Sequence, residues 1–114
     1  MAREWPEISE VKCEERVEFE SRGRRRLWIS MKVQGKADGV GSAWLYYRST
    51  PKLPFTRVAM KPGKDGAFVG ETDAVFVGEQ VWYYVEARAP FDTGTTTFSP
   101  EEAEAKPVRH VVGR

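Results

Sequence analysis

Cysteine and histidine are nearly absent from this 114-residue sequence, which contains one of each. Cys13 has no second cysteine with which to form an internal disulfide or to hold zinc or an iron–sulfur centre. Nothing in the sequence marks the other members of a Ser-His-Asp relay around His110. We therefore expect no enzyme activity, catalytic residue, metal site or cofactor, with Cys13 a buried or incidental thiol and His110 an ordinary strand residue.

An excess of charge of either sign and a long apolar run are also lacking. Eighteen lysines and arginines against 17 acids leave a formal net charge of +1, so no overall field draws the protein to nucleic acid. No apolar stretch is long enough to predict membrane insertion, and the N-terminus lacks the apolar core of a signal peptide. For the location this leaves two alternatives, a cytosolic protein or a domain excised from a longer extracytoplasmic bacterial protein.

Helix signals are confined to Pro100–Lys106, which is long enough for about one or two turns. The clearest strand is Arg26–Gln34, because apolar residues alternate with polar ones from Leu27 to Val33. A hairpin is expected to pair Phe55–Met60 with Ala67–Thr72 through an Asp65-Gly66 turn. The remaining predicted strands are Ile8–Lys12, Arg16–Glu20, Ala43–Ser49, Gln80–Ala87, Thr95–Phe98 and Val108–Val112.

Short strands with a turn about every ten residues, and no helices between them, predict an all-β fold. We expect one domain over residues 1–114, a two-sheet antiparallel sandwich of about seven strands with a loose segment at 1–7. A small closed barrel is the alternative.

The order of several short motifs resembles a known class of domain. These are the alternation from Leu27, a glycine-rich turn, Leu45-Tyr46-Tyr47-Arg48, Phe55–Met60, Gly66-Ala67-Phe68 and Val81–Ala87. Together they are similar to the immunoglobulin-like and fibronectin type III-like domains of large bacterial proteins. Met31 stands where fibronectin type III domains usually carry a core tryptophan, and the Cys…Trp…Cys signature of antibody domains is absent. The resemblance implies a sandwich that serves binding or architecture rather than catalysis.

Loops and charge clusters offer weaker candidates. Gly39–Gly41 and Gly63–Gly66 precede no predicted helix, which favours turns over phosphate loops. Arg22–Arg26 is the one basic cluster, expected at a turn before Leu27. We interpret it as a solvated turn rather than a phosphate or acidic-partner site, because four acids precede it: Glu14, Glu15, Glu18 and Glu20. The loop acids Asp38, Asp65, Asp73 and Asp92 lack the spacing of a calcium site.

The best candidate site lies on the two aromatic strands. Period-two alternation assigns one phase to the core: Ala43, Leu45 and Tyr47 with Val81, Tyr83, Val85 and Ala87. The opposite phase is predicted to form an exposed binding face of Trp44, Tyr46, Arg48, Trp82, Tyr84 and Glu86. Arg48 and Glu86 are expected to pair across the strands. The alternative is that Pro51–Phe55 or a neighbouring domain covers this face.

Two functions fit such a face. The favoured one is a non-catalytic protein-interaction or spacer module, part of a larger bacterial protein or assembly, whose partner is another protein or a neighbouring domain. The alternative is a carbohydrate-binding module, in which Trp and Tyr rings stack on sugars while Arg48 or Glu86 bonds the hydroxyls. The sequence favours the first, because it does not specify the planarity and spacing that sugar platforms need.

Overall fold

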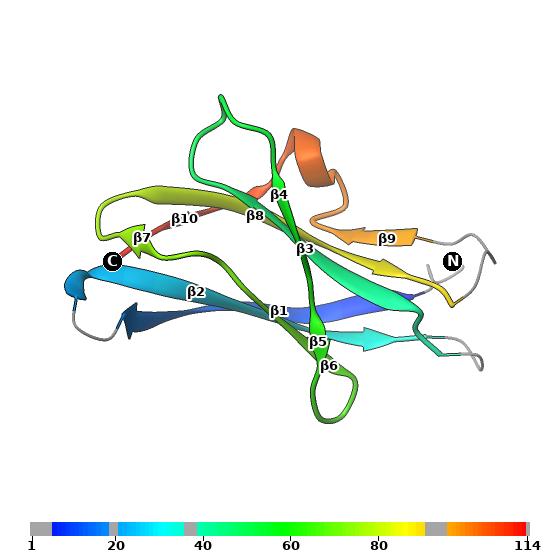
Figure 1. Ribbon diagram of the computed structural model, residues 1–114. Coiled ribbons are helices and arrows are strands. Elements are labelled where there is room, and N and C mark those ends of the chain that lie inside the picture. Colours follow the sequence, from blue (N-terminus) through cyan, green and yellow to red (C-terminus); the bar gives the residue numbers. More distant parts are fainter. Residues whose placement is uncertain (1–5, 19–20, 36–38, 91–95, 114) are drawn as a thin grey trace.

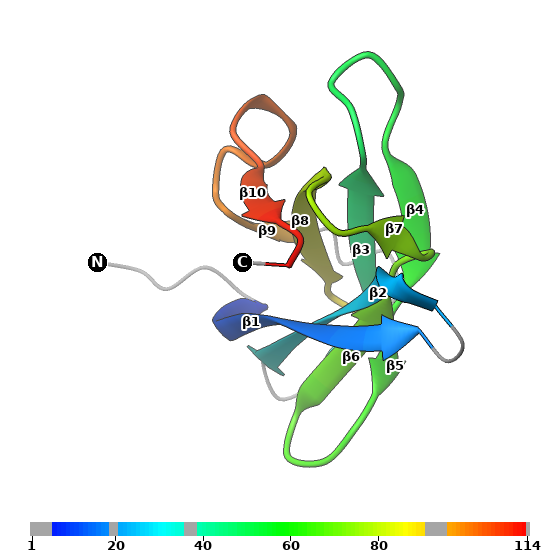
Figure 2. The ribbon, with the colours of Figure 1, turned by 90° about the vertical axis from the view of Figure 1, so that its left-hand side faces the viewer.

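Two antiparallel sheets face each other in the computed structural model of the protein (Figure 1), which describes residues 6–18, 21–35, 39–90 and 96–113. One sheet, here the β2 sheet, has the order β1-β2-β6-β5, with β7 also on β2. The other, the β8 sheet, has the order β10-β8-β3-β4, with β9 also on β8. Figure 2 shows the two layers with β1, β2, β6 and β5 in one and β3, β4, β8, β9 and β10 in the other. The predicted all-β sandwich is confirmed.

The strands are β1 (Glu7–Glu18), β2 (Ser21–Gln34), β3 (Ser42–Arg48), β4 (Thr56–Ala59), β5 (Lys61–Pro62), β6 (Ala67–Glu71), β7 (Val75–Phe76), β8 (Gln80–Arg88), β9 (Thr96–Ser99) and β10 (Val108–Val111). A 3-10 helix, η1 (Ala103–Ala105), lies within the segment predicted to be helical. Within the described ranges, no helix is long and apolar enough to span a membrane. Of the segment expected to be loose, Pro6 is buried and Glu7 already belongs to β1, while residues 1–5 lie outside the described residues.

The core forms between the inward phases of β2, β3 and β8. Leu27, Ile29 and Met31 of β2 are buried, and they face Leu45 of β3 and Val85 of β8 across the sandwich. Each fully buried aliphatic side chain contributes about 1.5–3 kcal/mol of transfer free energy. The predicted phase of all three strands is confirmed.

β1 and β2 form a longer hairpin than the sequence suggested. The candidate Ile8–Lys12 and the described part of Arg16–Glu20 belong to one strand, β1. Its pairing with β2 shifts register between Ser9 and Lys12, where Glu10 has a φ of 50°. The prediction that the basic cluster Arg22–Arg26 lies in a turn is wrong, because the whole cluster lies within β2, where Arg24 and Arg25 pair with β7. Polar side chains do not end the strand, because the outward positions of an antiparallel sheet can face water.

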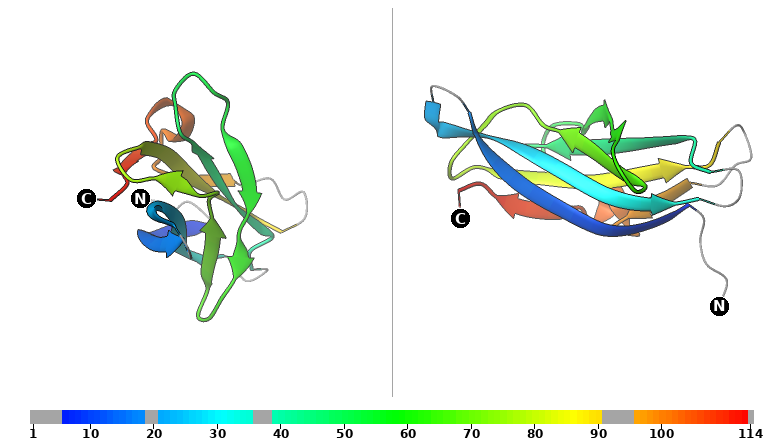
Figure 3. Two further views of the ribbon diagram at one scale, coloured as in Figure 1. Left: turned by 60° about the vertical axis from the view of Figure 1, so that its left-hand side comes forward. Right: turned by 90° about the horizontal axis from the view of Figure 1, so that it is seen from below.

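The chain changes sheets at Met60. β4 pairs with β3, while only Lys61 and Pro62 pair with β6. The predicted hairpin of Phe55–Met60 with Ala67–Thr72 is therefore wrong, although its turn is present, with φ of 55° at Asp65 and 76° at Gly66. Met60 donates its backbone N–H to the Ala43 carbonyl and buries its side chain in the core, and this anchors the crossing. Figure 3 shows the chain passing from β4 in one layer to β5 in the other.

Candidate functional site

The outer face of the β8 sheet brings the six predicted site residues together on adjacent strands. The register sets Trp44 opposite Glu86, Tyr46 opposite Tyr84 and Arg48 opposite Trp82. Since residues opposite one another in an antiparallel pair share a face, the predicted juxtaposition is present. Two of the six residues, Tyr84 and Glu86, are buried where the prediction placed them on an exposed face.

The middle row of this face is covered. The Tyr46 and Tyr84 rings are stacked with centroids 4.5 Å apart, and Phe55 meets Tyr84 edge-on at 4.9 Å. The centroid of the Phe98 ring of β9 lies 6.1 Å from that of the Tyr84 ring. Tyr84 is therefore 6% exposed, and the prediction that it lies open to solvent is wrong. Its burial raises the pKa of Tyr84 to about 12, so the phenol stays protonated and neutral at physiological pH.

Glu86 is also buried rather than exposed, at 4%. Its Oε1 accepts hydrogen bonds from the Tyr46 hydroxyl at 3.2 Å and from Arg88 Nε at 2.9 Å. The expected pair of Arg48 with Glu86 is absent, because Arg48 lies opposite Trp82 and Glu86 opposite Trp44. Arg48 donates instead to the Leu53 carbonyl at 3.3 Å and stacks over the Phe55 ring at 4.1 Å.

Two tryptophans at diagonal corners of the face are partly exposed. Trp44 donates its indole N–H to Ser42 Oγ at 3.1 Å. The guanidinium of Arg57 lies 4.3 Å from the Trp44 ring centroid, and that of Arg88 lies 5.9 Å away. Trp82 occupies the other corner, between its neighbours in register Arg48 and Arg109. The face is thus a rigid aromatic floor with a tryptophan at each of two corners and arginines around it.

Several residues of this face were missed from the sequence. Arg88 could have been found, because it lies two residues beyond Glu86 and so shares its face. Arg57 and Arg109 required the register of β4 and β10, which their short strands do not reveal. Phe55 covers Tyr84 from the segment Pro51–Phe55, which was predicted as the alternative cover of this face. Phe98 reaches the same ring from β9, and no local pattern marks it.

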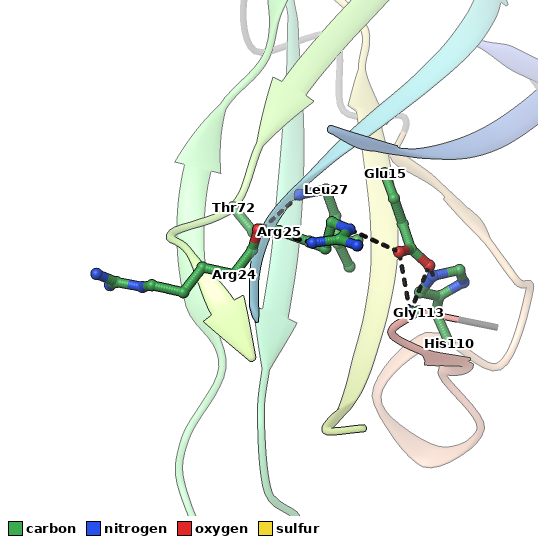
Figure 4. A network of polar contacts seen from close by, with 7 residues as sticks. All are labelled: Glu15, Arg24, Arg25, Leu27, Thr72, His110 and Gly113. Atoms are coloured by element: carbon green, nitrogen blue, oxygen red, sulfur yellow. Dashed lines mark hydrogen bonds and ion pairs between the residues drawn. The ribbon is translucent and has the colours of Figure 1, made fainter. Parts of the chain in front are cut away.

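Glu15 joins the two sheets on the side formed by β1 and β10 (Figure 4). His110 Nε2 lies 2.6 Å from Glu15 Oε2, and the Gly113 N–H donates to Glu15 Oε1 at 2.9 Å. Arg25 Nε lies 3.9 Å from the same Oε1. His110 is in β10, in the strand position predicted for it, and its carboxylate partner ties the end of the chain to β1.

Arg24 and Arg26 of the basic cluster also make contacts within the protein. Arg26 forms an ion pair with Glu71 of β6 at 3.5 Å, and Arg24 lies 5.5 Å from the Phe76 ring centroid. Of the four acids expected to balance these arginines, Glu15 contacts Arg25. Among the residues whose placement is described, no group of three or more His, Cys, Asp or Glu is arranged to hold a metal ion.

Cys13 is expected to react slowly with thiol reagents in the folded protein. Burial, together with the nearby Glu15 and Glu14 carboxylates, raises the pKa of its thiol to about 11. At about pH 8, roughly one such thiol in a thousand is the reactive thiolate. Reaction with DTNB in native buffer and in guanidinium chloride measures this directly. The native rate should be far below the unfolded rate, and equal rates would contradict the prediction.

Comparison with known proteins provides no family or relative from which a function could be transferred. The sequence matches no family model, and a search of curated proteins finds no similar sequence. The outer face of the β8 sheet is the feature from which a function can be argued.

Proposed function

We propose that the protein is a non-catalytic interaction module of the immunoglobulin-like or fibronectin type III-like kind. It binds another protein, or a neighbouring domain of a larger bacterial assembly, through the outer face of the β8 sheet. The observation that supports this most is the pair of partly exposed tryptophans, Trp44 and Trp82, held beside arginines on a packed tyrosine floor. Tryptophan, tyrosine and arginine supply most of the binding energy at protein interfaces.

The tyrosine floor between the two tryptophans is packed before binding. The Tyr46–Tyr84 stack has an interplanar angle of 8°, and Phe55 and Phe98 hold Tyr84 from other elements. Side chains already fixed in the free protein lose little rotational freedom on association. More of the contact energy is then retained as affinity.

The charge of the face indicates an acidic partner. Arg48, Arg57, Arg88 and Arg109 belong to this face by register or by contact with its rings. Its one acid in β3 and β8, Glu86, is buried and bonded to Arg88 and Tyr46. Complementary charge steers association and excludes partners of the wrong sign.

A carbohydrate-binding module is the second candidate. It draws support from Trp82, which is partly exposed beside Arg48 and Arg109, two donors for sugar hydroxyls. Trp44 supports it less, because the Arg57 guanidinium already lies over the ring at 4.3 Å and a stacked sugar would have to displace it. The protein-binding function is therefore preferred.

Replacing Trp44 or Trp82 with alanine is expected to weaken binding of the partner by about tenfold or more, as at other interface anchors. Affinity capture with the wild-type chain as bait identifies the partner by mass spectrometry, and calorimetry with the purified partner gives the affinities. A glycan array run with the same three proteins tests the second candidate.

Phe76→Ala is the matched control, because Phe76 is an exposed aromatic residue on the β2 sheet. It should leave the affinity unchanged. A partner that binds both tryptophan variants as tightly as wild type would overturn the proposed site. Array binding that is lost in Trp82→Ala would assign the face to carbohydrate instead.

A further inference from the structure

A cleft of about 430 Å³ opens on the side of the sandwich away from Glu15, between β4 and β6. Its lining is mostly apolar and is drawn from both sheets: Trp28, Val58, Ala59, Pro62, Val69 and Gly70, with Lys61, Gly63 and Glu71. Gly70 takes no side chain, because a Cβ there would lie 3.0 Å from Leu45 Cδ2. Core side chains of the facing sheet therefore pack directly against the backbone of Gly70, and the cleft opens at the edge of the sandwich beside this contact.

The β4 wall of the cleft presents unpaired backbone groups. Met60 donates its N–H to the Ala43 carbonyl, and hydrogen bonding alternates along an antiparallel strand. Residues 56, 58 and 60 therefore bond to β3, and the N–H and C=O groups of Arg57 and Ala59 point away from it. Since β4 is the last strand of its sheet, these groups are free to pair with an added strand.

The β6 wall follows the same rule. Thr72 donates its N–H to the Leu27 carbonyl, so even-numbered residues of this strand bond to β2 and Glu71 points its backbone groups outward. β5 pairs with β6 only as far as Lys61 opposite Val69, which leaves Glu71 beyond the end of that ladder. Polar backbone groups thus border an apolar space on both sides, which is the arrangement that an extended chain satisfies.

The rim of the cleft favours a negatively charged occupant. Arg57 and Lys61 are exposed on β4 and β5, and Lys64 follows in the turn. The acid of the rim, Glu71, is paired with Arg26 at 3.5 Å. Lysine and arginine on an edge strand also disfavour its pairing with the same edge of a second copy, because like charges would meet.

We propose that this cleft binds an extended segment of a partner protein in which acidic and apolar residues alternate, and that the segment adds to β4 as a further strand. Its backbone pairs with Arg57 and Ala59. One apolar side chain enters the cleft against Trp28 and Val69, with Lys61 beside Val69 at its rim, and the acidic side chains on the other face of the segment meet Arg57. This surface shares Arg57 with the Trp44 corner of the outer face, but the lining of the cleft is otherwise separate, and the proposal does not depend on the function proposed for that face.

The test selects peptides from a random display library on the immobilised full chain and measures synthetic copies of the enriched peptides by fluorescence anisotropy. Enriched sequences should alternate Asp or Glu with apolar residues, and their affinity should fall as salt rises. Ala59→Pro should weaken them by at least about tenfold, because it removes an outward N–H without breaking the bonds of β4 to β3. Ala59→Ser, the matched control, keeps that N–H and should bind as wild type does.

Circular dichroism shows whether Ala59→Pro is folded. If it is not, Val69→Glu replaces it, because this change puts a like charge beside the acidic segment. Absence of any enrichment, or peptides that bind Ala59→Pro and Val69→Glu as tightly as wild type, would overturn the proposal. So would peptides lost only in Trp44→Ala or Trp82→Ala, which would belong to the outer face. Dimers in sedimentation velocity that Ala59→Pro abolishes would assign the edge to self-association instead.

Discussion

Ile29→Ala is expected to lower the free energy of unfolding by about 2–5 kcal/mol, the range observed when a large buried aliphatic side chain is truncated. Ile29 is 0% exposed, and it lies in the middle of β2 with Cys13 of β1 and Gly70 of β6 as its register partners. Truncation removes the transfer free energy of the lost methyl groups and leaves a cavity that the two flanking strands hold open. Urea unfolding followed by circular dichroism measures the loss.

Val17→Ala is the control for this change. Val17 is also β-branched and belongs to the adjoining strand β1, but it is 64% exposed, so its truncation should change the free energy by less than about 0.5 kcal/mol. An Ile29→Ala variant with the wild-type midpoint would mean that β2 presents its opposite phase to the core.

The phase of the central strands could be predicted because it is a local property. In β2, β3 and β8, aliphatic residues such as Leu27, Leu45 and Val85 occupy alternate positions, and a strand turns successive side chains to opposite faces. Once the residues on the buried face of a strand are known, the remaining residues must lie on its opposite face. The same rule, with β3 and β8 taken as neighbouring strands, predicted that six residues share one face: Trp44, Tyr46, Arg48, Trp82, Tyr84 and Glu86.

The pairing of β4 could not be predicted in this way. Val58 and Met60 are apolar whichever sheet they join, so the alternation in Phe55–Met60 is equally compatible with β3 and with β6 as a partner. The Asp65-Gly66 turn favoured the local hairpin. Burial of Met60 in the core favours the crossing to the other sheet instead. This burial depends on core residues that are distant from Met60 in the sequence.

The cover over the predicted site was not local either. Phe98 of β9 completes the cover that Phe55 of the segment Pro51–Phe55 provides, and Glu15 contacts His110, 95 residues later in the chain. Neither contact leaves a spacing or a periodicity in the sequence. The exposure of Tyr84 and Glu86 and the pairing of Glu86 with Arg48 were therefore the parts of the candidate site that the sequence predicted wrongly.

Tyr84→Ala is expected to lower the free energy of unfolding by about 3–5 kcal/mol, as for other buried aromatic residues, although Tyr84 lies on the outer face of its sheet. Its ring contacts those of Tyr46, Phe55 and Phe98, so truncation removes the centre of the cluster. Aromatic pairs contribute about 0.5–1.5 kcal/mol each beyond their buried area. Thermal and urea unfolding of the variant measure the loss.

Two companion variants separate packing from other roles of Tyr84. Tyr84→Phe keeps the ring and should cost little, because no bond of the Tyr84 hydroxyl is needed to hold the stack together. Trp82→Ala removes a larger ring from the next position of that phase, yet Trp82 is partly exposed, so its loss should cost less stability than that of Tyr84. If Trp82→Ala instead unfolds the protein while Tyr84→Ala is tolerated, the tryptophan is the packed residue and the tyrosine the accessible one. The assignment of Trp82 to a binding surface would then fail.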